Sequence, residues 1–361
     1  MDFKISNSYD DSKTKINKTQ VILIVLAIFF LILSIVLIVN QNKSIKNKKT
    51  TTPTSPVRTI GSDDTNNNDN NDKLYRPIAV MIDNNIGDDL QAGLQDSYLN
   101  YEIIVEGGLT RIMSLFNNTD NVLIGPVRSA RNYFLDYAKE SDAVYAHYGW
   151  SPNTPDDIKT LNIDNINGMT SPGPFRRDTK LKAPHNVFTT LEYIKKHMDD
   201  NDFRSSSDDW EVLNVNSDSV DLDDFIKEAE YLQMAEKVTI NYSYYQNRSY
   251  TYDSENKYYL RSMNGKAHKD KSSEQQLHYK NVIIEYVKNN TIDDEGRQSL
   301  ETTGEGTGYY MTNGYITNIK WKKDNRTSKT IYKYMDGTEV KINDGNTFIN
   351  IVPIENNIII E

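Results

Sequence analysis

The hydrophobic pattern separates one long apolar run from a polar segment and a series of short hydrophobic stretches. The apolar run extends from Val21 to Val39 and is interrupted only by Ser34. As a helix, its 19 residues would measure about 28 Å, close to the roughly 30 Å hydrocarbon core of a membrane. We therefore predict a short cytoplasmic tail over residues 1–20 and one N-terminal transmembrane helix over residues 21–39. A cleaved secretory signal is the alternative, although its apolar core is typically only about 7–15 residues long.

Lysines flank the apolar run on both sides, so the positive-inside rule does not orient it. The nearest ones before and after the run are Lys13, Lys15 and Lys18, then Lys43, Lys46, Lys48 and Lys49. The absence of cysteine suits a compartment that is poor in thiols. We therefore expect the large C-terminal part to be extracytoplasmic.

The next segment, residues 40–73, has no hydrophobic periodicity and is rich in Asn, Thr, Ser, Lys and Asp. Such a composition buries too little apolar surface to offset the conformational entropy that folding costs. We predict a disordered tether between the membrane and the folded part of the chain.

Strand and helix patterns follow the tether. The strand patterns are rich in β-branched residues and bounded by Gly, Asn or Asp; they cover residues 78–84, 101–108, 110–116, 121–125 and 143–147. Helical patterns cover residues 130–140 and 189–198, and the second begins with the capping-box residues Thr189 and Glu192. Strands mixed with helices predict an α/β (or α+β) domain with a mixed sheet over residues 74–215.

A smaller, mostly β domain is predicted over residues 236–361, after an acidic connection at residues 216–235. Residues 238–244 alternate between apolar and polar side chains, and residues 282–287 have the pattern of a core strand. Turn dipeptides separate the later runs: Asn264–Gly265, Asn313–Gly314, Asp336–Gly337 and Asp344–Gly345.

Composition narrows the chemistry. The chain has no cysteine, which excludes disulfides, thiolate catalysis, Fe–S clusters and cysteine zinc sites. Its net charge of -10 argues against a nucleic-acid-binding surface spread over the protein. The five histidines lack a metal-ligand spacing. We therefore predict no nucleic-acid partner, no metal site and no cofactor.

The densest group of polar residues is GPVRSARNY, residues 125–133. Arg128 and Arg131 are three positions apart, so on a helix they would lie roughly on one face. Two guanidinium groups close to the free backbone N–H groups of a helix start suit a carboxylate or a phosphate. The alternative is that both arginines pair with acids of this acidic protein and only brace the fold.

Further candidates lie where predicted strands end. Asp83, Asn84, Glu106 and His147 all occupy such positions. In open α/β sheets, ligands gather outside the carboxyl ends of the strands. A lone histidine can equally be a hydrogen-bonded structural residue, so both readings of His147 stay open.

A third polar group combines FRRD (175–178) with APHN (183–186), and its candidate residues are Arg176, His185 and Asn186. It again contains the Arg and His side chains that bind anions or transfer protons. Folding could bring this group to the others, although the sequence alone does not show it.

Several motifs follow one another in a definite order. The first are MIDN (81–84), VEGGLTR (105–111), IGPVRSARNYF (124–134), YAHYGWSP (145–152), FRR (175–177) and APHN (183–186). The later ones are NVIIEY (281–286), GEGTGYY (304–310) and DGNTFINIVP (344–353). Over residues 74–355 the chain thereby resembles the bacterial YerB-like family, domain of unknown function 3048, with its N-terminal and C-terminal domains.

This resemblance implies an extracytoplasmic envelope protein of Gram-positive-type bacteria. Members of the family are frequently described as lipoproteins, and some have been linked with the peptidoglycan-synthesis machinery. The present chain departs from that pattern because it has no cysteine and so no lipobox. The predicted transmembrane helix would then replace the lipid anchor. The family implies no established reaction.

Two functional hypotheses follow. In the first, a non-catalytic envelope module binds an anionic cell-wall glycan or a peptidoglycan-synthesis protein through Arg111, Arg128, Arg131, His147, Arg176, Asn84 and Asn186. In the second, a hydrolytic enzyme acts on an envelope polymer, with His147 or His185 as general acid/base and Asp83 or Glu106 as its partner. A purely structural or assembly role is the remaining alternative.

Overall fold

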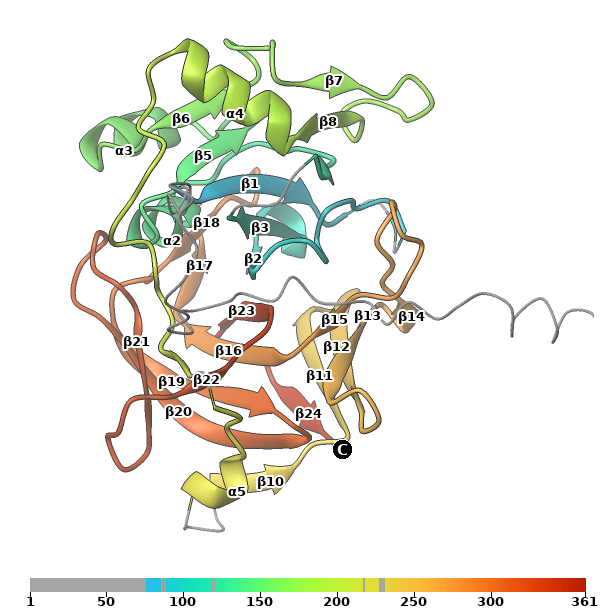
Figure 1. Ribbon diagram of the computed structural model, residues 1–361, viewed down its shortest axis with the longest axis vertical. Helices are drawn as coiled ribbons and strands as arrows, with labels where there is room; N and C mark the ends of the chain where they lie inside the picture. Colours follow the sequence, from blue (N-terminus) through green and yellow to red (C-terminus); the bar gives the residue numbers. More distant parts are fainter. Residues whose placement is uncertain (1–75, 86, 88, 118–120, 217, 227–230) are drawn as a thin grey trace, which may run out of the picture. The chain divides into compact units, whose positions relative to one another are not determined.

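The computed structural model describes residues 76–361, apart from residues 86, 88, 118–120, 217 and 227–230 (Figure 1). The predicted tail, transmembrane helix and tether, residues 1–73, lie outside the described residues. Within the described part, no helix is long and apolar enough to span a membrane.

A mixed sheet of eleven strands forms the centre of the described part. In spatial order its strands are β10 (Leu232–Met234), β20 (Tyr315–Lys323), β19 (Gly304–Thr312), β16 (Asn281–Val287), β23 (Thr347–Pro353), β2 (Leu99–Ile104), β3 (Thr110–Phe116), β1 (Ile78–Asp83), β5 (Val144–His147) and β6 (Asn165–Asn167), with β21 (Ile331–Tyr334) paired to β20. β1 runs parallel to β5, and β5 runs parallel to β6. β3 lies antiparallel between β2 and β1. The carboxyl ends of β2, β1, β5 and β6 therefore point to the same end of the sheet.

The central sheet is continuous across the two regions predicted as separate domains. β2 of the first region pairs in parallel with β23 of the second, with Leu99 opposite Thr347 and Ile103 opposite Ile351. The fold is thus rich in sheet and poor in helix, with a large N-terminal part and a β-rich C-terminal region.

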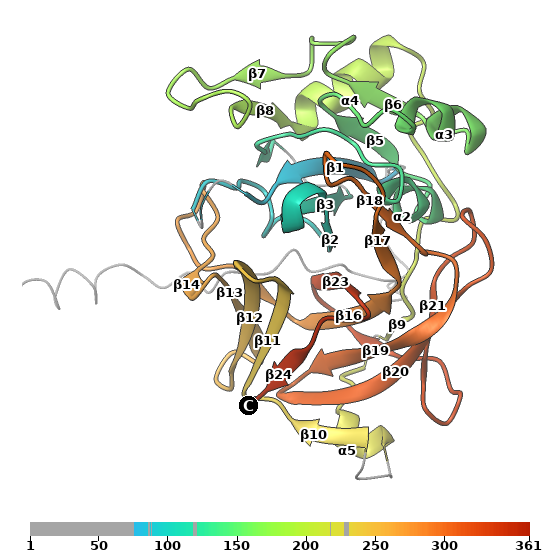
Figure 2. The same cartoon turned by 180° about the vertical axis from the view of Figure 1, so that it is seen from behind.

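A second sheet, of six strands, packs against one face of the central sheet (Figures 1 and 2). Its strands are β14 (Lys266–Ala267), β13 (Tyr258–Met263), β12 (Gln246–Asp253), β11 (Lys237–Ser243) and β24 (Ile358–Ile360), with β15 (His278–Tyr279) paired to β13. In β11, the buried Val238, Ile240 and Tyr242 alternate with less buried residues. They share a hydrophobic core with Ile112 and Phe348 of the central sheet. The predicted alternation is therefore confirmed.

The opposite face of the central sheet is covered by α2 (Phe134–Glu140) and α3 (Thr154–Thr160). Leu135 and Tyr137 of α2 share a core with Tyr101, Met113 and Ile351 of the sheet. α2 begins four residues later than the helix predicted over residues 130–140. The reason is that the chain before it is extended and bonds to β1 and to the segment after β5.

α4 (Leu191–Asp200) packs on the same face as the second sheet, through Leu191, Ile194 and Met198. Its N-cap is Thr190, whose hydroxyl accepts a hydrogen bond from the backbone N–H of Tyr193. The cap thus lies one residue later than the capping box predicts. The remaining elements are short: β4 (Leu123–Ile124), β7 (Arg176–Arg177), β8 (Val187–Thr190), β9 (Val215–Asn216), β17 (Asn289–Thr291), β18 (Gln298–Leu300), β22 (Ile342–Asn343), α5 (Leu222–Phe225) and the 3-10 turn η1 (Glu106–Gly108).

Candidate functional site

Charged residues gather where β1 and β2 end. Asp83 is the last residue of β1, and Glu106 begins η1, just after β2. Arg111, near the start of the antiparallel β3, lies directly opposite Asp83 in the β1–β3 pairing. The sheet therefore brings Asp83, Glu106 and Arg111 to one end, as the predicted strand ends suggest.

An extended segment, residues 125–130, carries a further arginine to the same place. The backbone N–H of Arg128 donates a hydrogen bond to the carbonyl oxygen of Met81, at 2.9 Å. Gly125 has φ +146°, and a Cβ atom there would lie 2.8 Å from the ring of Phe188. Only glycine fits this close approach. The segment is thereby held against β1 and β8, and Arg128 is placed beside Asp83.

Asp83 is shared by two side chains. His185 Nδ1 lies 2.5 Å from Asp83 Oδ2, and Arg128 Nε lies 3.2 Å from the same oxygen. Asp83 is buried, whereas the side chain of His185 is 33% exposed and that of Arg128 is 20% exposed. Arg128 also donates a hydrogen bond to the carbonyl oxygen of Pro184. A buried carboxylate thus orients an imidazole and a guanidinium that both reach the surface.

Glu106 is the second carboxylate at this end of the sheet, and two arginines contact it. Arg131 makes a bidentate contact with it, with Nε 2.5 Å from Oε1 and Nη2 2.8 Å from Oε2. Arg111 Nη2 lies 3.9 Å from Glu106 Oε2, and Arg111 Nη1 donates to the carbonyl oxygen of Ser129. Although burial raises the pKa of Glu106, the hydrogen bond and charge of Arg131 and the charge of Arg111 bring it below its ordinary value. Glu106 is therefore a carboxylate under ordinary conditions.

We call these six residues the strand-end cluster: Asp83, Glu106, Arg111, Arg128, Arg131 and His185. It combines three guanidinium groups with only two carboxylates. Burial, together with the charges of Arg131 and Arg128, lowers the pKa of Arg111 to about 10. The three positive charges are therefore close enough to repel one another, and the cluster carries an excess of positive charge.

His147 does not reach the surface of this cluster. Its side chain is buried, with Nδ1 2.8 Å from the carbonyl oxygen of Gly149 and Nε2 3.2 Å from Asn165 Oδ1. Burial lowers its pKa to about 4. Nδ1 contacts the loop after β5 and Nε2 contacts the first residue of β6. These contacts favour the structural reading of His147 over a ligand or acid/base role.

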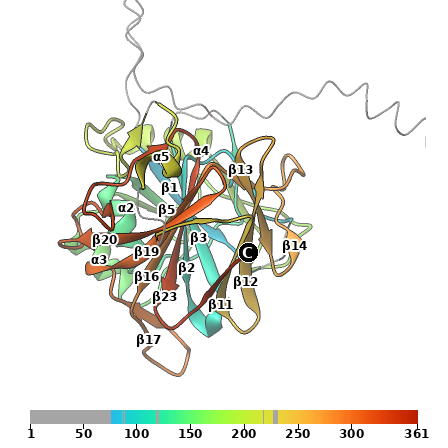
Figure 3. The same ribbon diagram turned by 90° about the horizontal axis from the view of Figure 1, so that it is seen from below.

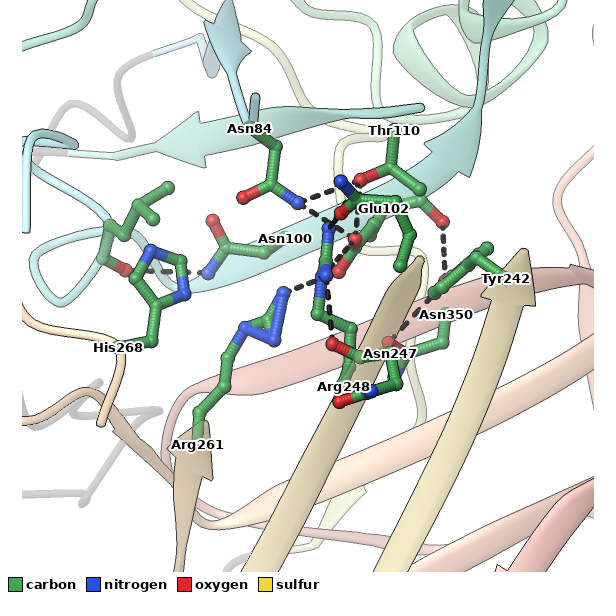
Figure 4. Close-up of polar contacts among 12 residues, drawn as sticks. Asn84, Asn100, Glu102, Thr110, Tyr242, Asn247, Arg248, Arg261, His268 and Asn350 are labelled. Carbon is green, nitrogen blue, oxygen red and sulfur yellow. Dashed lines mark hydrogen bonds and ion pairs between the residues drawn. The ribbon is translucent and has the colours of Figure 1, made fainter. Parts of the chain in front are cut away.

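Asn84 points away from the cluster. Because side chains alternate along a strand, it lies on the face opposite to that of Asp83. Its Nδ2 donates to Glu102 Oε1 at 2.7 Å and to Thr110 Oγ1 at 2.8 Å (Figure 4). The predicted grouping of Asn84 with Asp83 in one ligand site is therefore not supported.

The network around Asn84 is a buried ion cluster. Arg248 Nε lies 2.7 Å from Glu102 Oε1, and Arg261 Nη2 contacts Glu102 Oε2 (Figure 4). All three side chains are fully buried. Burial raises the pKa of Glu102, but the charges of Arg248 and Arg261 outweigh it and lower the pKa below its ordinary value. This network joins β2 of the N-terminal region to β12 and β13 of the C-terminal region.

The third polar group lies beside the cluster and differs from the prediction in its arginine. Arg176 is exposed, donates to Gly173 and Phe175 carbonyl oxygens, and lies 4.8 Å over the ring of Tyr193. It takes no part in the strand-end cluster. Arg177 belongs to the same FRR motif but is not among the predicted ligand-binding residues, and it faces the other way along β7.

Arg177 connects the loops on both sides of the cluster. Its Nη1 donates to Asn186 Oδ1 at 2.7 Å, and its guanidinium lies 5.1 Å over the ring of Tyr148. Asn186 is buried and also donates to the carbonyl oxygens of Asp178 and Leu181. Asn186 therefore shapes the loop that carries His185. Alternation along β7 could have distinguished Arg177 from Arg176, had the strand been recognised.

Asn167, at the end of β6, is a structural residue that sequence reasoning missed. Its Oδ1 accepts hydrogen bonds from the backbone N–H groups of Gly149, at 2.9 Å, and Met169, at 3.0 Å. It thereby fixes the loop after β5 from the next strand. A strand as short as β6 gives no usable periodic signal.

Two hairpins of the C-terminal region flank η1 (Figure 3). A Cβ atom on Gly296, between β17 and β18, would lie 3.2 Å from the backbone nitrogen of Gly107. The hydroxyl of Tyr245, between β11 and β12, donates to the carbonyl oxygen of Gly107. Both regions therefore shape the surroundings of Glu106. Among the described residues, no three histidine, aspartate or glutamate side chains are grouped so that they could hold a metal ion.

Comparison with known proteins places these observations in a family. Residues 65–204 match the N-terminal domain, and residues 238–349 the C-terminal domain, of the protein family of unknown function DUF3048. A Bacillus subtilis (strain 168) protein named "Putative lipoprotein YerB" is 29% identical over 284 residues, which are 77% of this chain and 81% of that protein. The crystal structure of YerB from Bacillus subtilis superposes with a TM-score of 0.68 at 26% identity, covering 80% of this chain and 94% of that one. The predicted resemblance is confirmed: the chain belongs to the DUF3048 family and contains both of its domains.

Proposed function

We propose that this protein is a membrane-anchored, extracytoplasmic envelope protein whose strand-end cluster binds an anionic group. The group would belong to a cell-wall polymer or to a protein of peptidoglycan synthesis. The observation that carries the proposal is that the cluster contains three guanidinium groups and only two carboxylates, although the net charge of the whole protein is -10.

The partial burial of the cluster supports a specific site over a diffuse charged surface. The side chains of Arg128 and Arg131 are 20% and 13% exposed, so both are oriented by the protein and still accessible. Partly buried charges are screened less by salt than exposed ones. Guanidinium groups bind carboxylate and phosphate oxygens with two parallel hydrogen bonds. The cluster therefore suits a phosphate or a carboxylate equally well.

The anchor is proposed from the sequence and from the relative. The apolar run at residues 21–39 has the length of a membrane span, and the Bacillus relative is named as a lipoprotein. Since the present chain contains no cysteine, we assign the anchoring role to residues 21–39.

The hydrolytic alternative is favoured by one specific observation, the contact between His185 and Asp83. Asp83 holds His185 through Nδ1, and the partly exposed side chain leaves Nε2 to exchange a proton with a substrate or a water molecule. Arg128 and Arg131 would then stabilise negative charge that develops in the reaction. We rank this second because the contact supplies an acid/base pair without a recognised nucleophile.

Co-sedimentation of the full-length protein, in nanodiscs of zwitterionic lipid, with purified cell-wall sacculi tests both candidates. Sacculi with and without their anionic polymers are compared, and the supernatant is analysed by mass spectrometry. The test variant is Arg128→Ala/Arg131→Ala. The control, Arg204→Ala/Lys237→Ala, removes two positive charges from ion pairs elsewhere.

Anion recognition predicts binding that requires the anionic polymers, is lost in the test variant and is retained in the control. Loss of one charged hydrogen bond costs about 1.5–3 kcal/mol, so the affinity should fall at least tenfold. Released fragments that disappear in His185→Gln would establish the enzyme instead. Binding that is equal in both double variants would overturn the proposed site.

A further inference from the structure

A polar cleft opens beside the strand-end cluster, between the two family domains. It has a volume of about 360 Å³, within the range of about 300–1,000 Å³ found for small-molecule sites. Asn132 and Tyr133, directly before α2, form one wall, and Ser299 and Thr303, around the end of β18, form another. Arg326, between β20 and β21, completes the lining.

The charged groups of the cleft are already paired. Arg326 Nε lies 2.7 Å from Asp136 Oδ1, and its Nη1 lies 3.1 Å from Asp157 Oδ1. Asp136 also accepts a hydrogen bond from Thr302. Glu301 lies 3.1 Å from Lys288 Nζ. Charges that are matched within the protein do not require an ion from outside, so the cleft does not have the chemistry of a cation or anion site.

The uncharged polar groups of the cleft are the ones available to a ligand. Within the described residues, the side chains of Asn132, Ser299 and Thr303 form no hydrogen bond with the protein. An amide and two hydroxyls both donate and accept hydrogen bonds. Tyr133 is buried at the base of the cleft, and its hydroxyl donates a hydrogen bond to the carbonyl oxygen of Ile104, so it contributes little to the polar lining. These uncharged groups match a neutral sugar ring, whose hydroxyls also donate and accept hydrogen bonds.

The cleft and the strand-end cluster share two segments of chain. Arg131 of the cluster directly precedes Asn132 of the cleft. On the other side, Gly296 lies against η1 next to Glu106, and the chain continues from this turn into β18, which carries Ser299 to the cleft. A ligand that extends along this junction would meet the arginines at one end and the neutral lining at the other.

We infer that this cleft is a binding site for a neutral sugar ring of a glycan. The assignment of that sugar to a cell-wall polymer whose anionic group occupies the strand-end cluster rests on the function proposed above. The sugar site itself depends only on the lining of the cleft. The sugar site would be shared between the two family domains, because each domain supplies only one of its walls.

Titration of the full-length protein in nanodiscs with a β-1,4-linked tetramer of N-acetylglucosamine, followed by saturation-transfer NMR, tests the inference. Ser299→Trp fills the cleft from an exposed strand position, and Asn132→Ala/Thr303→Ala removes hydrogen-bonding groups without adding bulk. Ser254→Trp, in the exposed turn between β12 and β13, is the matched control. Arg128→Ala/Arg131→Ala separates the sugar site from the anion site.

The inference predicts saturable binding of the tetramer, weakened at least tenfold by Ser299→Trp and at least fivefold by Asn132→Ala/Thr303→Ala. The Ser254→Trp control and the double arginine variant should bind the neutral tetramer as the wild type does. No binding by the wild type, or equal binding by Ser299→Trp and Ser254→Trp, would overturn the sugar site. If the wild type does not bind the tetramer but still binds the anionic polymer, the sugar site is wrong and the proposed function is retained. If the wild type binds neither the tetramer nor the anionic polymer, both the sugar site and the proposed function are wrong.

Discussion

Asp83 and Asn84 are consecutive in the chain, yet they serve opposite faces of the central sheet. The Asp83 carboxylate contacts Arg128 and His185 in the strand-end cluster, whereas the Asn84 carboxamide donates to Glu102 in the buried ion cluster. The end of β1 thus connects the candidate ligand site with the network that joins the two family domains. Substitutions in the strand-end cluster and in the buried ion cluster can therefore be tested separately.

The buried ion cluster is expected to dominate the coupling between the domains. Glu102→Gln leaves Arg248 and Arg261 buried without a counter-charge. Removing one partner of a buried ion pair typically costs about 3–5 kcal/mol, so urea unfolding of the full-length protein should show a loss of that size. Asp200→Asn, which breaks the exposed pair with Lys196, should cost less than about 1 kcal/mol. Equal losses in the two variants would show that the buried cluster contributes little.

Gly125 is expected to tolerate no side chain. Gly125→Ala forces a Cβ atom to within 2.8 Å of Phe188 and 2.9 Å of the carbonyl oxygen of Val187, at φ +146°. Strain and overpacking of this kind cost about 2 kcal/mol or more, which thermal unfolding would detect. Gly173→Ala is the control because nothing lies within 4 Å of its Cβ position. A Gly125→Ala variant as stable as Gly173→Ala would contradict the close approach of residues 125–130 to β8.

Because His147 is buried, we expect the protein to lose stability in acid. Burial lowers its pKa to about 4 in the folded protein, against an ordinary value of 6.5. The unfolded chain therefore takes up a proton first, and stability falls as the pH drops from about 6.5 toward about 4, by up to about 3 kcal/mol. The stability difference between wild type and His147→Gln should shrink over that range. His197→Gln, on α4, is the control. If the difference in stability between wild type and His147→Gln does not change over this pH range, burial does not lower the pKa of His147.

Because Glu285 is buried, we expect its contribution to stability to have the opposite pH dependence. Burial raises its pKa to about 7, from an ordinary value of 4.5, despite hydrogen bonds from the hydroxyls of Tyr332 and Tyr137. The folded protein therefore holds a proton that the unfolded chain has lost, and stability falls as the pH rises from about 4.5 to about 7. Chemical unfolding of wild type and Glu285→Gln at several pH values isolates this contribution. A wild type and variant with parallel pH profiles would show that Glu285 does not titrate in this range.

The strand-end cluster was partly predictable from the sequence because of one regularity of sheets. Asp83, Glu106 and Arg111 adjoin strand ends, and strands that run in the same direction finish at the same end of a sheet. The pairing of Asp83 with His185 was one of the combinations that the hydrolytic hypothesis left open. The sequence could not select it, because it joins residues 102 positions apart through an irregular loop. Asn84 illustrates the reverse case: alternation along β1 already places it opposite to Asp83, and only the shared position at the strand end suggested otherwise.

The continuity of the sheet had no signal in the sequence. β2 and β23 pair over residues that are nearly 250 positions apart in the chain. Both strands are buried along their whole length, although β2 contains Asn100 and Glu102 and β23 contains Asn350. Local patterns identify such strands without naming their neighbours. The cleft between the domains follows from that pairing, so it could not be predicted either.

The most direct test of the account is a calorimetric titration of the full-length protein, in nanodiscs, with a soluble poly(glycerol phosphate) chain. Wild type, Arg128→Ala/Arg131→Ala and the charge-matched Arg204→Ala/Lys237→Ala are compared at the same ionic strength. The account predicts saturable binding by the wild type and the control, with at least a tenfold loss of affinity in the first variant. Equal affinities of the two double variants, or no saturable binding by the wild type, would contradict it.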